Sequence, residues 1–309
     1  MKKTLCIGNT TVDVIIKLDH LPSCTDDVNI ENHQLLLGGC PYNVYDTLTK
    51  FADFPAQLCS VVGSGIYGNF VKAKLQQQNI PIFATLKNIQ NGCCYCLVDK
   101  NGERSFMALH GAEYLFNPQW MASIKLDTVD SIYICGLELE EKTGKDLVSW
   151  LETLPSTITI YFAPGPRFYL IEKELIQRIF KLHPILHINE SEALSFTYST
   201  NVETAAKNLI RQTLNTVIIT LGEKGSMAIV QNKIAAPPFI KYKIITASSV
   251  SVKKENIIDT IGAGDSHIAA FIAYTKRGLS IEKALFKANE VSAKIVQTKG
   301  AHLPETFLL

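Results

Sequence analysis

Several features that would place the chain in a special class are missing from it. No apolar run approaches the ~18–20 residues that a membrane-spanning helix needs. The formal net charge is only +1, from 30 Lys and Arg against 29 Asp and Glu, so nucleic acid or an anionic membrane is not expected as the main partner. The first residues reach Asp13 after one short apolar patch, which predicts a strand and its loop rather than a signal peptide. We therefore expect a cytoplasmic protein.

Cysteine is too scarce for a disulfide scaffold, with eight residues in a chain of 309. This number predicts reduced thiols that are mostly buried. The one cluster, Cys93 to Cys96, contains a C-x-x-C pair, but a zinc site would need a second ligand pair at matching spacing, and the sequence has none. Because Cys93 to Val98 has the pattern of a β-strand, we interpret these cysteines as thiols packed on a strand, with no metal.

Two common nucleotide-binding motifs are also missing. There is no GxxxxGK[ST] phosphate loop. Gly63 to Gly68 matches GxGxxG formally, but dinucleotide binding also needs an acidic residue roughly 20 positions later, and residues 69–92 contain neither Asp nor Glu. The match therefore predicts a strand–turn–helix junction and no NAD. His183 and His187 have the spacing of a helical metal pair, but Pro184 between them prevents that helix.

What is present is the composition and rhythm of a globular α/β protein, with 47% hydrophobic and 19% charged residues. Strand and helix patterns alternate, which predicts a doubly wound sheet with helices on both faces. The predicted strands are Lys3–Ile7, Val12–Leu18, Gln57–Val62, Cys93–Val98, Ser131–Ile134, Thr157–Phe162, Pro184–Ile188 and Thr216–Thr220. The predicted helices are Tyr42–Phe51, Asn69–Gln78, Thr143–Leu154 and Ala205–Gln212.

Two strand-like stretches, residues 11–37 and 92–110, interrupt this rhythm because no helix lies within them. The second stretch predicts a hairpin that turns at Asn101 and Gly102. We expect the two insertions to pair into a small sheet above the main one, within a single domain that spans residues 1–309.

The segment with the clearest chemistry is Asp259 to Ser266, which reads DTIGAGDS and leads into an apolar helix. Small residues allow the backbone to approach a ligand closely, and the first amides of a helix bind anions. Asp265 would then lie beside an anion site, where its carboxylate could accept a proton from an attacking hydroxyl. The alternative is that Asp265 only caps its helix.

Two more segments follow predicted strands, at the sheet edge where α/β proteins bind ligands. The loop from Thr220 through Gly222 to Gly225 could hold a nucleotide, although a turn between two strands has the same pattern. Asn189 and Glu192 offer the hard oxygen ligands that suit Mg²⁺ held through water and phosphates. A solvated helix start is the alternative for this pair.

The first part of the chain offers polar groups that could bind a polyol. Asp13 lies just past the first glycine, and the sequence from Gly38 and Gly39 to Asn43 opens a helix. An Asp and an Asn on neighbouring loops can bracket a polyol through paired acceptors and donors. Either residue could equally be a turn residue or a helix cap.

Together these segments resemble the ribokinase-like (PfkB) carbohydrate kinases, whose carboxy-terminal signature is D-T-[VI]-G-A-G-D-[ST]. The ordered set runs through the Asp13 loop, Gly39 to Asn43, Gly102 to Phe106, Asn189 to Glu192, Thr220 to Gly225, the signature and Lys299 to Ala301. The resemblance implies a three-layer α/β/α sandwich with a small β-sheet lid. It also implies transfer of the γ-phosphate of ATP to a hydroxyl, usually of a sugar or nucleoside.

The resemblance also implies a role for each matching residue. Asp265 would be the catalytic base, and Gly262, Ala263 and Gly264 would form the anion hole. The ATP residues would be Asn189, Thr220, Gly222, Gly225, Gly264 and Asn289, with Asn189 and Glu192 organising Mg²⁺. The acceptor residues would be Asp13, Gly39, Asn43 and Asp265, with Glu138 as the candidate for a sugar-side glutamate. Asp259, with the backbone near Ile261 and Gly300, would match the monovalent-cation site of some members and could bind K⁺.

The chain departs from the family pattern at three places that concern the acceptor more than phosphoryl transfer. His267 replaces the usual Phe after the signature, Ala163 stands where many members have Asp, and the junction at Ser64 and Gly65 lacks a common Asp. The acceptor therefore stays open. A nucleoside or vitamin-alcohol kinase is the close alternative, and a kinase-derived regulator that binds a sugar without catalysis is the alternative from another class.

We expect the lid to have two further properties. Its small sheet would bury an apolar face formed by Val12, Val14, Ile16 and Leu18 in a homodimer. It would also close over the acceptor to exclude water, with Gly38 and Gly39 and the turn at Asn101 and Gly102 as flexible points.

Overall fold

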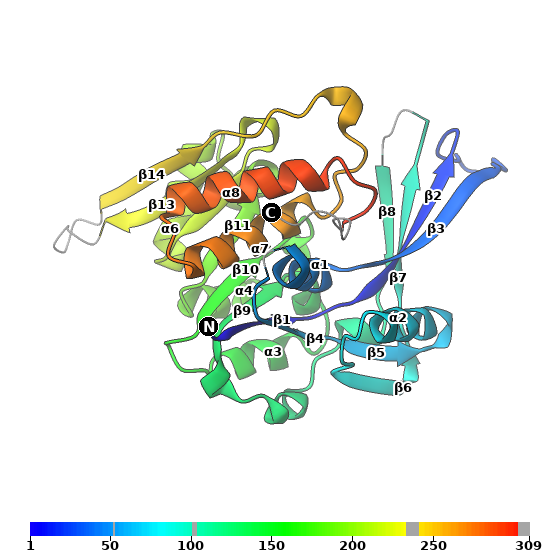
Figure 1. Ribbon diagram of the computed structural model, residues 1–309, viewed down its shortest axis with the longest axis horizontal. Helices are drawn as coiled ribbons and strands as arrows, with labels where there is room; N and C mark the ends of the chain where they lie inside the picture. The colour runs from blue at the N-terminus through cyan, green and yellow to red at the C-terminus, as the bar shows by residue number, and fades with distance from the viewer. Residues whose placement is uncertain (52, 101–103, 233–240, 302–309) are drawn as a thin grey trace.

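The computed structural model describes residues 1–51, 53–100, 104–232 and 241–301. A large sheet lies between two layers of helices, and a small sheet stands beside one end of it, at the right of Figure 1. This is the predicted α/β fold, with helices on both sides of a central sheet. Among the described residues, no helix is long and apolar enough to cross a membrane.

The large sheet has eight strands in the order β14-β13-β12-β11-β10-β9-β1-β4. From β4 to β12 neighbouring strands are parallel, and β13 and β14 are added antiparallel at one edge. Its strands are β1 (Lys3–Ile7), β4 (Ala56–Cys59), β9 (Val129–Cys135), β10 (Thr159–Ala163), β11 (Ile185–Asn189), β12 (Val217–Thr220), β13 (Ser226–Asn232) and β14 (Lys241–Ala247).

The helices cover both faces of this sheet because successive side chains of the buried strands point to opposite faces. In β1, for example, Cys6 packs into one hydrophobic core while Leu5 and Ile7 pack into the other. The first core includes α1 (Cys40–Asp46), α2 (Gly65–Gln77), α7 (Ala263–Lys276) and α8 (Ile281–Ile295). The second includes α3 (Gly144–Leu151), α4 (Lys173–Lys181), α5 (Glu190–Thr197) and α6 (Val202–Thr213).

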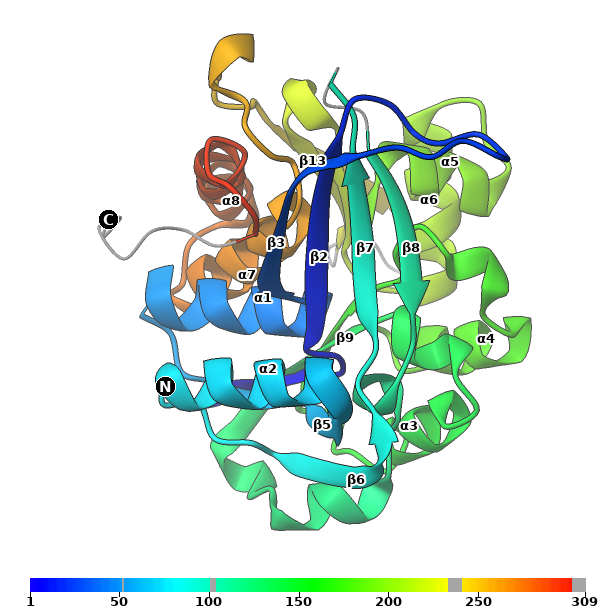
Figure 2. The same ribbon diagram turned by 90° about the vertical axis from the view of Figure 1, so that its right-hand side faces the viewer.

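The two predicted β insertions pair with each other in a separate four-stranded sheet, in the order β3-β2-β7-β8. Figure 2 shows this sheet with α2 beneath it. Its strands are β2 (Thr11–Leu18), β3 (Ile30–Gly38), β7 (Cys93–Val98) and β8 (Arg104–Leu109). The predicted turn at Asn101 and Gly102 lies outside the described residues. The cysteines of β7 lie on a strand as predicted, with Cys93 and Cys96 buried.

Short helical turns complete the chain. They are 3₁₀ turns at Ala112–Tyr114, Pro118–Ser123, Leu126–Thr128, Leu137–Glu140, Phe168–Leu170, Gly222–Lys224 and Lys254–Asn256. A π-helical turn at Thr47–Phe51 follows α1, so the predicted helix Tyr42–Phe51 is two elements rather than one.

The predicted strand Gln57–Val62 is also two strands. The first part, β4, pairs with β1, and this pairing stops at Cys59 because its partner Ile7 is the last residue of β1. The chain then continues as β5 (Val61–Ser64), which pairs with β6 (Ala84–Gln90) in a two-stranded sheet. The length of the partner strand therefore sets the break.

The apolar face predicted for a homodimer is wrong in its residues. Val12, Val14 and Leu18 are buried within this chain, and Ile16 is half-buried. Val12 and Val14 belong to the same core as Val71 of α2. The α2 helix therefore already covers this part of the small sheet.

Candidate active site

The polar residues singled out in the sequence gather at one edge of the large sheet. Asn9 follows β1, Glu138 follows β9, Asn189 ends β11, and Thr220 ends β12. These strands are parallel, so their carboxyl ends meet at the same edge, where open α/β sheets bind ligands. The amino-terminal end of α7 and the small sheet contribute the remaining groups.

The glycines of the signature shape the start of α7. Gly262 is the N-cap residue with φ +76°, and a Cβ there would lie 2.4 Å from the Cβ of Ala301, so only glycine fits. Ala263 and Gly264 are the first two residues of the helix. A Cβ on Gly264 would have no atom within 4 Å, which shows that this end of the helix is open to a ligand. The first amides of a helix of 14 residues therefore face an accessible space.

Asp265 lies in the first turn of α7 and contacts the acceptor segment. Its Oδ2 accepts a hydrogen bond of 2.8 Å from Nδ2 of Asn43, which is 222 residues away in the sequence and lies on α1. The side chain is half-buried. The structure thus brings together the predicted base and a predicted acceptor residue at the open amino-terminal end of α7.

In the described part of the chain, the segments that contain the predicted acceptor residues also contain buried amide oxygens without a hydrogen-bond partner. Among the described residues, Oδ1 of Asn9 and Oδ1 of Asn43 are buried and have no partner. A Cβ on Gly39, which has φ +101°, would lie 2.0 Å from Oδ1 of Asn9, and a Cβ on Gly38 would lie 2.1 Å from Oδ2 of Asp13. The two glycines therefore let the backbone approach these polar side chains.

Asn9 is a site residue that the sequence reasoning missed. The signal was present, because Asn9 directly follows the first buried strand and its glycine, Gly8. An unpartnered amide oxygen in a buried position is a natural contact for a hydroxyl of an acceptor.

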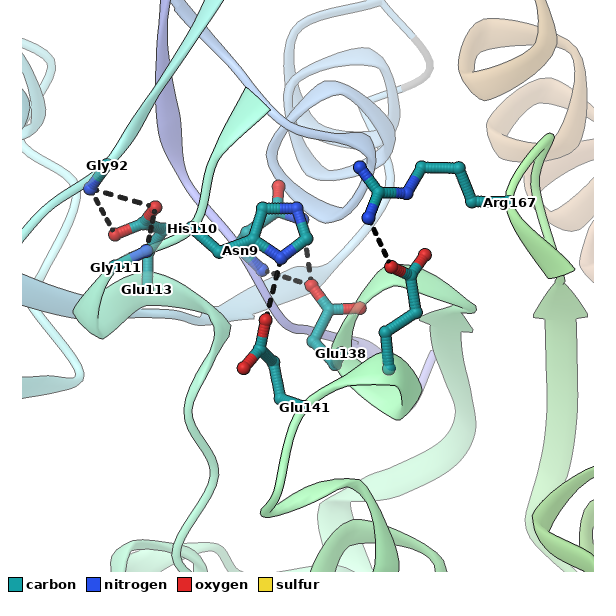
Figure 3. Close-up of polar contacts among 9 residues, drawn as sticks. Asn9, Gly92, His110, Gly111, Glu113, Glu138, Glu141 and Arg167 are labelled. Atoms are coloured by element: carbon teal, nitrogen blue, oxygen red, sulfur yellow. Dashed lines mark hydrogen bonds and ion pairs between the residues drawn. The ribbon is translucent and has the colours of Figure 1, made fainter. Parts of the chain in front are cut away.

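Glu138 lies behind this site and is only 2% exposed. Its Oε1 accepts hydrogen bonds from the backbone N (2.7 Å) and from Nδ2 (2.9 Å) of Asn9, and its Oε2 accepts one from Sγ of Cys135 (2.9 Å). Figure 3 shows Asn9 above the Glu138 carboxylate. Burial raises the pKa of Glu138 to about 7, although the bonds from Cys135 and Asn9 lower it. The Glu138 carboxylate, predicted to contact a sugar, is thus bonded to Asn9 and orients its side chain.

A His–Glu hydrogen bond and an Arg–Glu ion pair flank Glu138. Nδ1 of His110 lies 2.7 Å from Oε1 of Glu141, and Nη2 of Arg167 lies 2.6 Å from Oε2 of Glu140. In Figure 3, His110 and Arg167 extend from opposite sides toward the space above Glu138. Sequence reasoning missed all four residues, because polar contacts between separate loops leave no local pattern.

The predicted nucleotide loop is a tight turn after β12. The backbone N of Leu221 donates to the carbonyl O of Gly225 (2.8 Å), and Gly222 to Lys224 form a 3₁₀ turn. Gly225 has φ +98°, and a Cβ there would lie 2.2 Å from the carbonyl O of Ala247. The loop Thr220–Gly225 therefore packs directly on the backbone that follows β14.

Asn289 also binds the backbone at the end of β14. Its Nδ2 donates to the carbonyl oxygens of Ala247 (3.1 Å) and Ser248 (3.0 Å). Its Oδ1 lies 3.2 Å from Nε2 of His267, and Nδ1 of His267 lies 3.1 Å from Nε2 of His187. Asn289, predicted near adenine, is thus a buried side chain that holds the segment beside the nucleotide loop.

The proton positions in this chain of hydrogen bonds follow from its ends. Because the Asn289 amide nitrogen donates to two carbonyls, its oxygen must accept from Nε2–H of His267. Nδ1 of His267 then accepts from Nε2–H of His187. Burial lowers the pKa of His267 to about 4 and that of His187 well below its usual value, so both rings are neutral. His267, Asn289 and His187 form what we call the His–Asn relay.

Asn189 and Glu192 bond to each other at the start of α5. Oδ1 of Asn189 accepts from the backbone N of Glu192 (2.8 Å), and Oε2 of Glu192 accepts from the backbone N of Asn189 (3.1 Å), a capping box. Burial raises the pKa of Glu192, and the nearby charge of Asp265 contributes to the rise.

Mg²⁺ fits this pair only as an ion held mainly by other ligands. No group of three or more His, Cys, Asp or Glu residues with metal-binding geometry occurs in the described ranges. One carboxylate beside one amide is nevertheless a donor set that suits Mg²⁺ coordinated largely by water and phosphate oxygens.

Asp259 already has a full set of partners. Its Oδ1 accepts from the backbone N of Ile261 (2.7 Å), and its Oδ2 accepts from the backbone N of Gly300 (3.1 Å). Nη1 of Arg104, at the start of β8, pairs with Oδ1. The carboxylate predicted to bind a monovalent cation is thus paired with a guanidinium of the chain itself.

The family of the chain is shown by its similarity to known proteins. A family model described as pfkB family carbohydrate kinase matches residues 1–306. The chain belongs to this family. As a pfkB-family protein it is a sugar or nucleoside kinase.

Individual relatives are distant but cover almost the whole chain. The chain is 27% identical over 313 residues to the uncharacterized sugar kinase YegV of Escherichia coli (strain K12), covering 99% of this chain and 92% of YegV. Ribokinase of Giardia lamblia has a similar structure, with a TM-score of 0.82, 20% identity and coverage of 97% and 96%. The nucleoside kinase of Methanocaldococcus jannaschii has a TM-score of 0.77, 20% identity and coverage of 100% and 95%. The fold of this pfkB-family chain is therefore that of ribokinase.

Proposed function

We propose that this protein transfers the γ-phosphate of ATP, with Mg²⁺, to a hydroxyl group of a sugar or sugar-like alcohol. The observation that carries the proposal is the hydrogen bond between Asn43 and Asp265. In this hydrogen bond a carboxylate that can accept a proton contacts Asn43, which we assign to the acceptor, and the carboxylate belongs to the first turn of α7, a helix start that can bind phosphate.

In the proposed reaction, Asp265 accepts the proton of the acceptor hydroxyl as its oxygen attacks the γ-phosphorus. The new O–P bond forms while the bond from the γ-phosphorus to the bridging oxygen of ADP breaks, so ADP leaves with that electron pair. The amides of residues 262–264 stabilise the charge on the transferred phosphoryl oxygens. When bound, Mg²⁺ would neutralise phosphate charge beside Asn189 and Glu192.

The rest of the site divides between the two substrates. We assign ATP to the loop with Thr220, Gly222 and Gly225, with Asn289 acting through the backbone of Ala247 and Ser248. We assign the acceptor to Asn9, Asp13, Gly39 and Asn43. Supporting this division, Asn9 follows β1 and Asp13 lies on the small sheet, whereas Thr220 ends β12, which is separated from β1 by β11, β10 and β9 in the large sheet.

We also propose that the small sheet is the lid of one kinase domain over residues 1–309. The lid would cover the acceptor, because Asp13 lies on it and the reacting hydroxyl must be kept from water. We propose a homodimer as well, formed by the part of the small sheet that α2 leaves exposed.

ATP consumption by wild type should be measured over a panel of pentoses, hexoses, sugar phosphates and nucleosides. We expect one sugar-like class to stand out in kcat/KM. Asp265→Asn keeps the shape of the side chain but loses its proton affinity, so kcat should fall by roughly 10²–10⁴ while both substrates still bind. Asp127→Asn, an exposed change in another turn, is the matched control and should keep full activity.

Two results would count against the proposal. If Asp265 only caps its helix, Asn would cap about as well, and the variant would keep its kcat. If wild type binds ATP and phosphorylates nothing in the panel, the non-catalytic sugar-binding regulator becomes the better description. A clear preference for nucleosides would instead select the nucleoside kinase alternative.

A further inference from the structure

Arg104 and Asp259 form an ion pair between the small sheet and the signature. Their side chains are 17% and 5% exposed, and the two residues are 155 positions apart in the sequence. Nη2 of Arg104 also lies 3.5 Å from the carbonyl O of Ile258. Asp259 precedes the N-cap of α7, Gly262, by three residues and accepts the amide of Ile261, so the pair adjoins the turn that begins this helix.

The direction of Arg104 follows from the register of the small sheet. Arg104 of β8 pairs with Val98 of β7, which in turn pairs with Lys17 of β2. Two residues further along β8, Phe106 pairs with Cys96, which in turn pairs with Ile15. Alternate residues of a strand share a face, so Arg104 is on the same face of the sheet as Asp13. Asp13, proposed to bind the acceptor, and Arg104, which contacts Asp259 of the signature, thus lie on the same face of the small sheet.

A carboxylate as buried as that of Asp259 is costly unless a positive group compensates its charge. The backbone amides of Ile261 and Gly300 contribute only partial charges. Arg104 supplies the full positive charge. A monovalent cation would have to displace the guanidinium from Oδ1, which also accepts the amide of Ile261, so a cation such as K⁺ does not fit this site.

We propose that the guanidinium of Arg104 is the permanent cation of the signature turn, and that the protein therefore needs no monovalent metal ion. Arg104 is a positioning residue, because it acts on Asp259 and through it on the turn that carries Gly262. The kinetic part of this inference rests on the proposed kinase function. The ion-binding part does not.

The first test measures thermal stability in potassium chloride and in choline chloride at equal ionic strength. Wild type should have the same Tm in both salts. Arg104→Gln removes the charge and opens the site, so its Tm in choline should fall by roughly 5 °C and recover with increasing K⁺. Arg104→Lys keeps the charge and should not respond to K⁺. Arg178→Gln breaks another Arg–carboxylate pair, with Glu152, and is the matched control without a K⁺ response.

The second test measures kcat under the same conditions. Wild type should be equally active in both salts, and Arg104→Gln should lose about tenfold in choline and regain part of it in K⁺. A wild-type Tm that rises by several degrees with K⁺, or a wild-type kcat that rises severalfold, would overturn the inference while leaving the kinase proposal intact. A folded Arg104→Gln that ignores K⁺ would also overturn it. If Arg104→Gln does not fold, the K⁺ response of wild type and of Arg104→Lys still tests the inference. If no substrate is turned over, the Tm measurements alone test it.

Discussion

At the scale of single residues, the site contains two kinds of polar side chain. Asn9 and Asn43 keep an amide oxygen available for a ligand. Glu138 and Asn289 are buried and use their side chains on other residues of the protein. The sequence marks both kinds with the same residue types, so only their contacts tell a binding group from a supporting one.

The His–Asn relay leads to a prediction about stability and pH. We expect His267→Phe to lower the free energy of unfolding by about 1–3 kcal/mol at pH 8, because Oδ1 of Asn289 and Nε2–H of His187 lose their partner in a buried place. The polar neighbours of residue 267 would remain in the variant without a partner. Urea denaturation measures the change, and His33→Phe, at an exposed position of β3, is the matched control.

The same variant should change the pH dependence. The folded pKa of His267 is about 4, below its ordinary value of about 6.5, so the unfolded state binds more protons between these pH values. Wild-type stability therefore gains up to about 1.4 kcal/mol per pH unit from this residue as the pH rises through that window. The difference between the two proteins removes the contributions of titratable groups that do not contact His267. Parallel stability curves from pH 4 to 6.5 would contradict the assignment.

At the scale of elements, Glu113 connects the small sheet to the body of the protein. Its Oε1 accepts from the backbone N of Gly92 (3.0 Å) and of Gly111 (3.2 Å), and its Oε2 accepts from Gly92 (2.9 Å), as Figure 3 shows. Gly92 precedes β7 and Gly111 follows β8. Burial raises the pKa of Glu113 to about 7, while these amide bonds lower it. One carboxylate thus holds both ends of the hairpin.

This clamp limits where the lid can bend. A Cβ on Gly92 would lie 1.7 Å from the carbonyl O of Leu109, and one on Gly111 would lie 2.3 Å from that of Gln90, so the two strands cross closely there. We expect the sheet to move as a unit about this crossing and about Gly38 and Gly39.

Hydrogen exchange tests this expectation. Saturating acceptor together with a non-hydrolysable ATP analogue should slow exchange in residues 11–37 and 92–110, because a closed lid protects its amides. The helices α4 and α6, residues 173–181 and 202–213, serve as the internal control and should change little. Unchanged exchange in the small sheet would show that it does not close.

At the scale of the whole molecule, an uncovered apolar patch remains on the small sheet. Met107 and Leu109 of the edge strand β8 are 54% and 57% exposed. The register places them opposite Tyr95 and Cys93, on the face that also carries Val14 and Val12. The α2 helix covers the β2 part of this face and leaves the β8 part open.

We expect a second copy of the chain to cover this patch. Sedimentation should show a dimer at micromolar concentration, because an exposed edge strand with large apolar side chains favours association. Met107→Ser combined with Leu109→Ser should yield a monomer. Tyr198→Ser, which removes a side chain that is 94% exposed elsewhere, should leave the dimer intact. A stable wild-type monomer would refute the prediction.

The sequence alone determined the fold class and the order of most elements. Buried strands such as Val217–Thr220 are short β-branched runs, and the glycines of the signature mark a turn into a helix, so local chemistry is sufficient to predict them. It also indicated the family, since the ordered motifs predicted the one whose model matches residues 1–306. Their assembly at one edge follows from parallel strands.

The tertiary structure alone decided what individual side chains in those segments do. Arg104 reaches Asp259, Asn43 reaches Asp265 and His187 reaches His267 across 155, 222 and 80 residues. The break between β4 and β5 likewise depends on where β1 ends. Periodicity and propensity describe which face of an element is buried, but a hydrogen bond or ion pair depends on the position of two elements in space. That position is set by the packing of the whole chain.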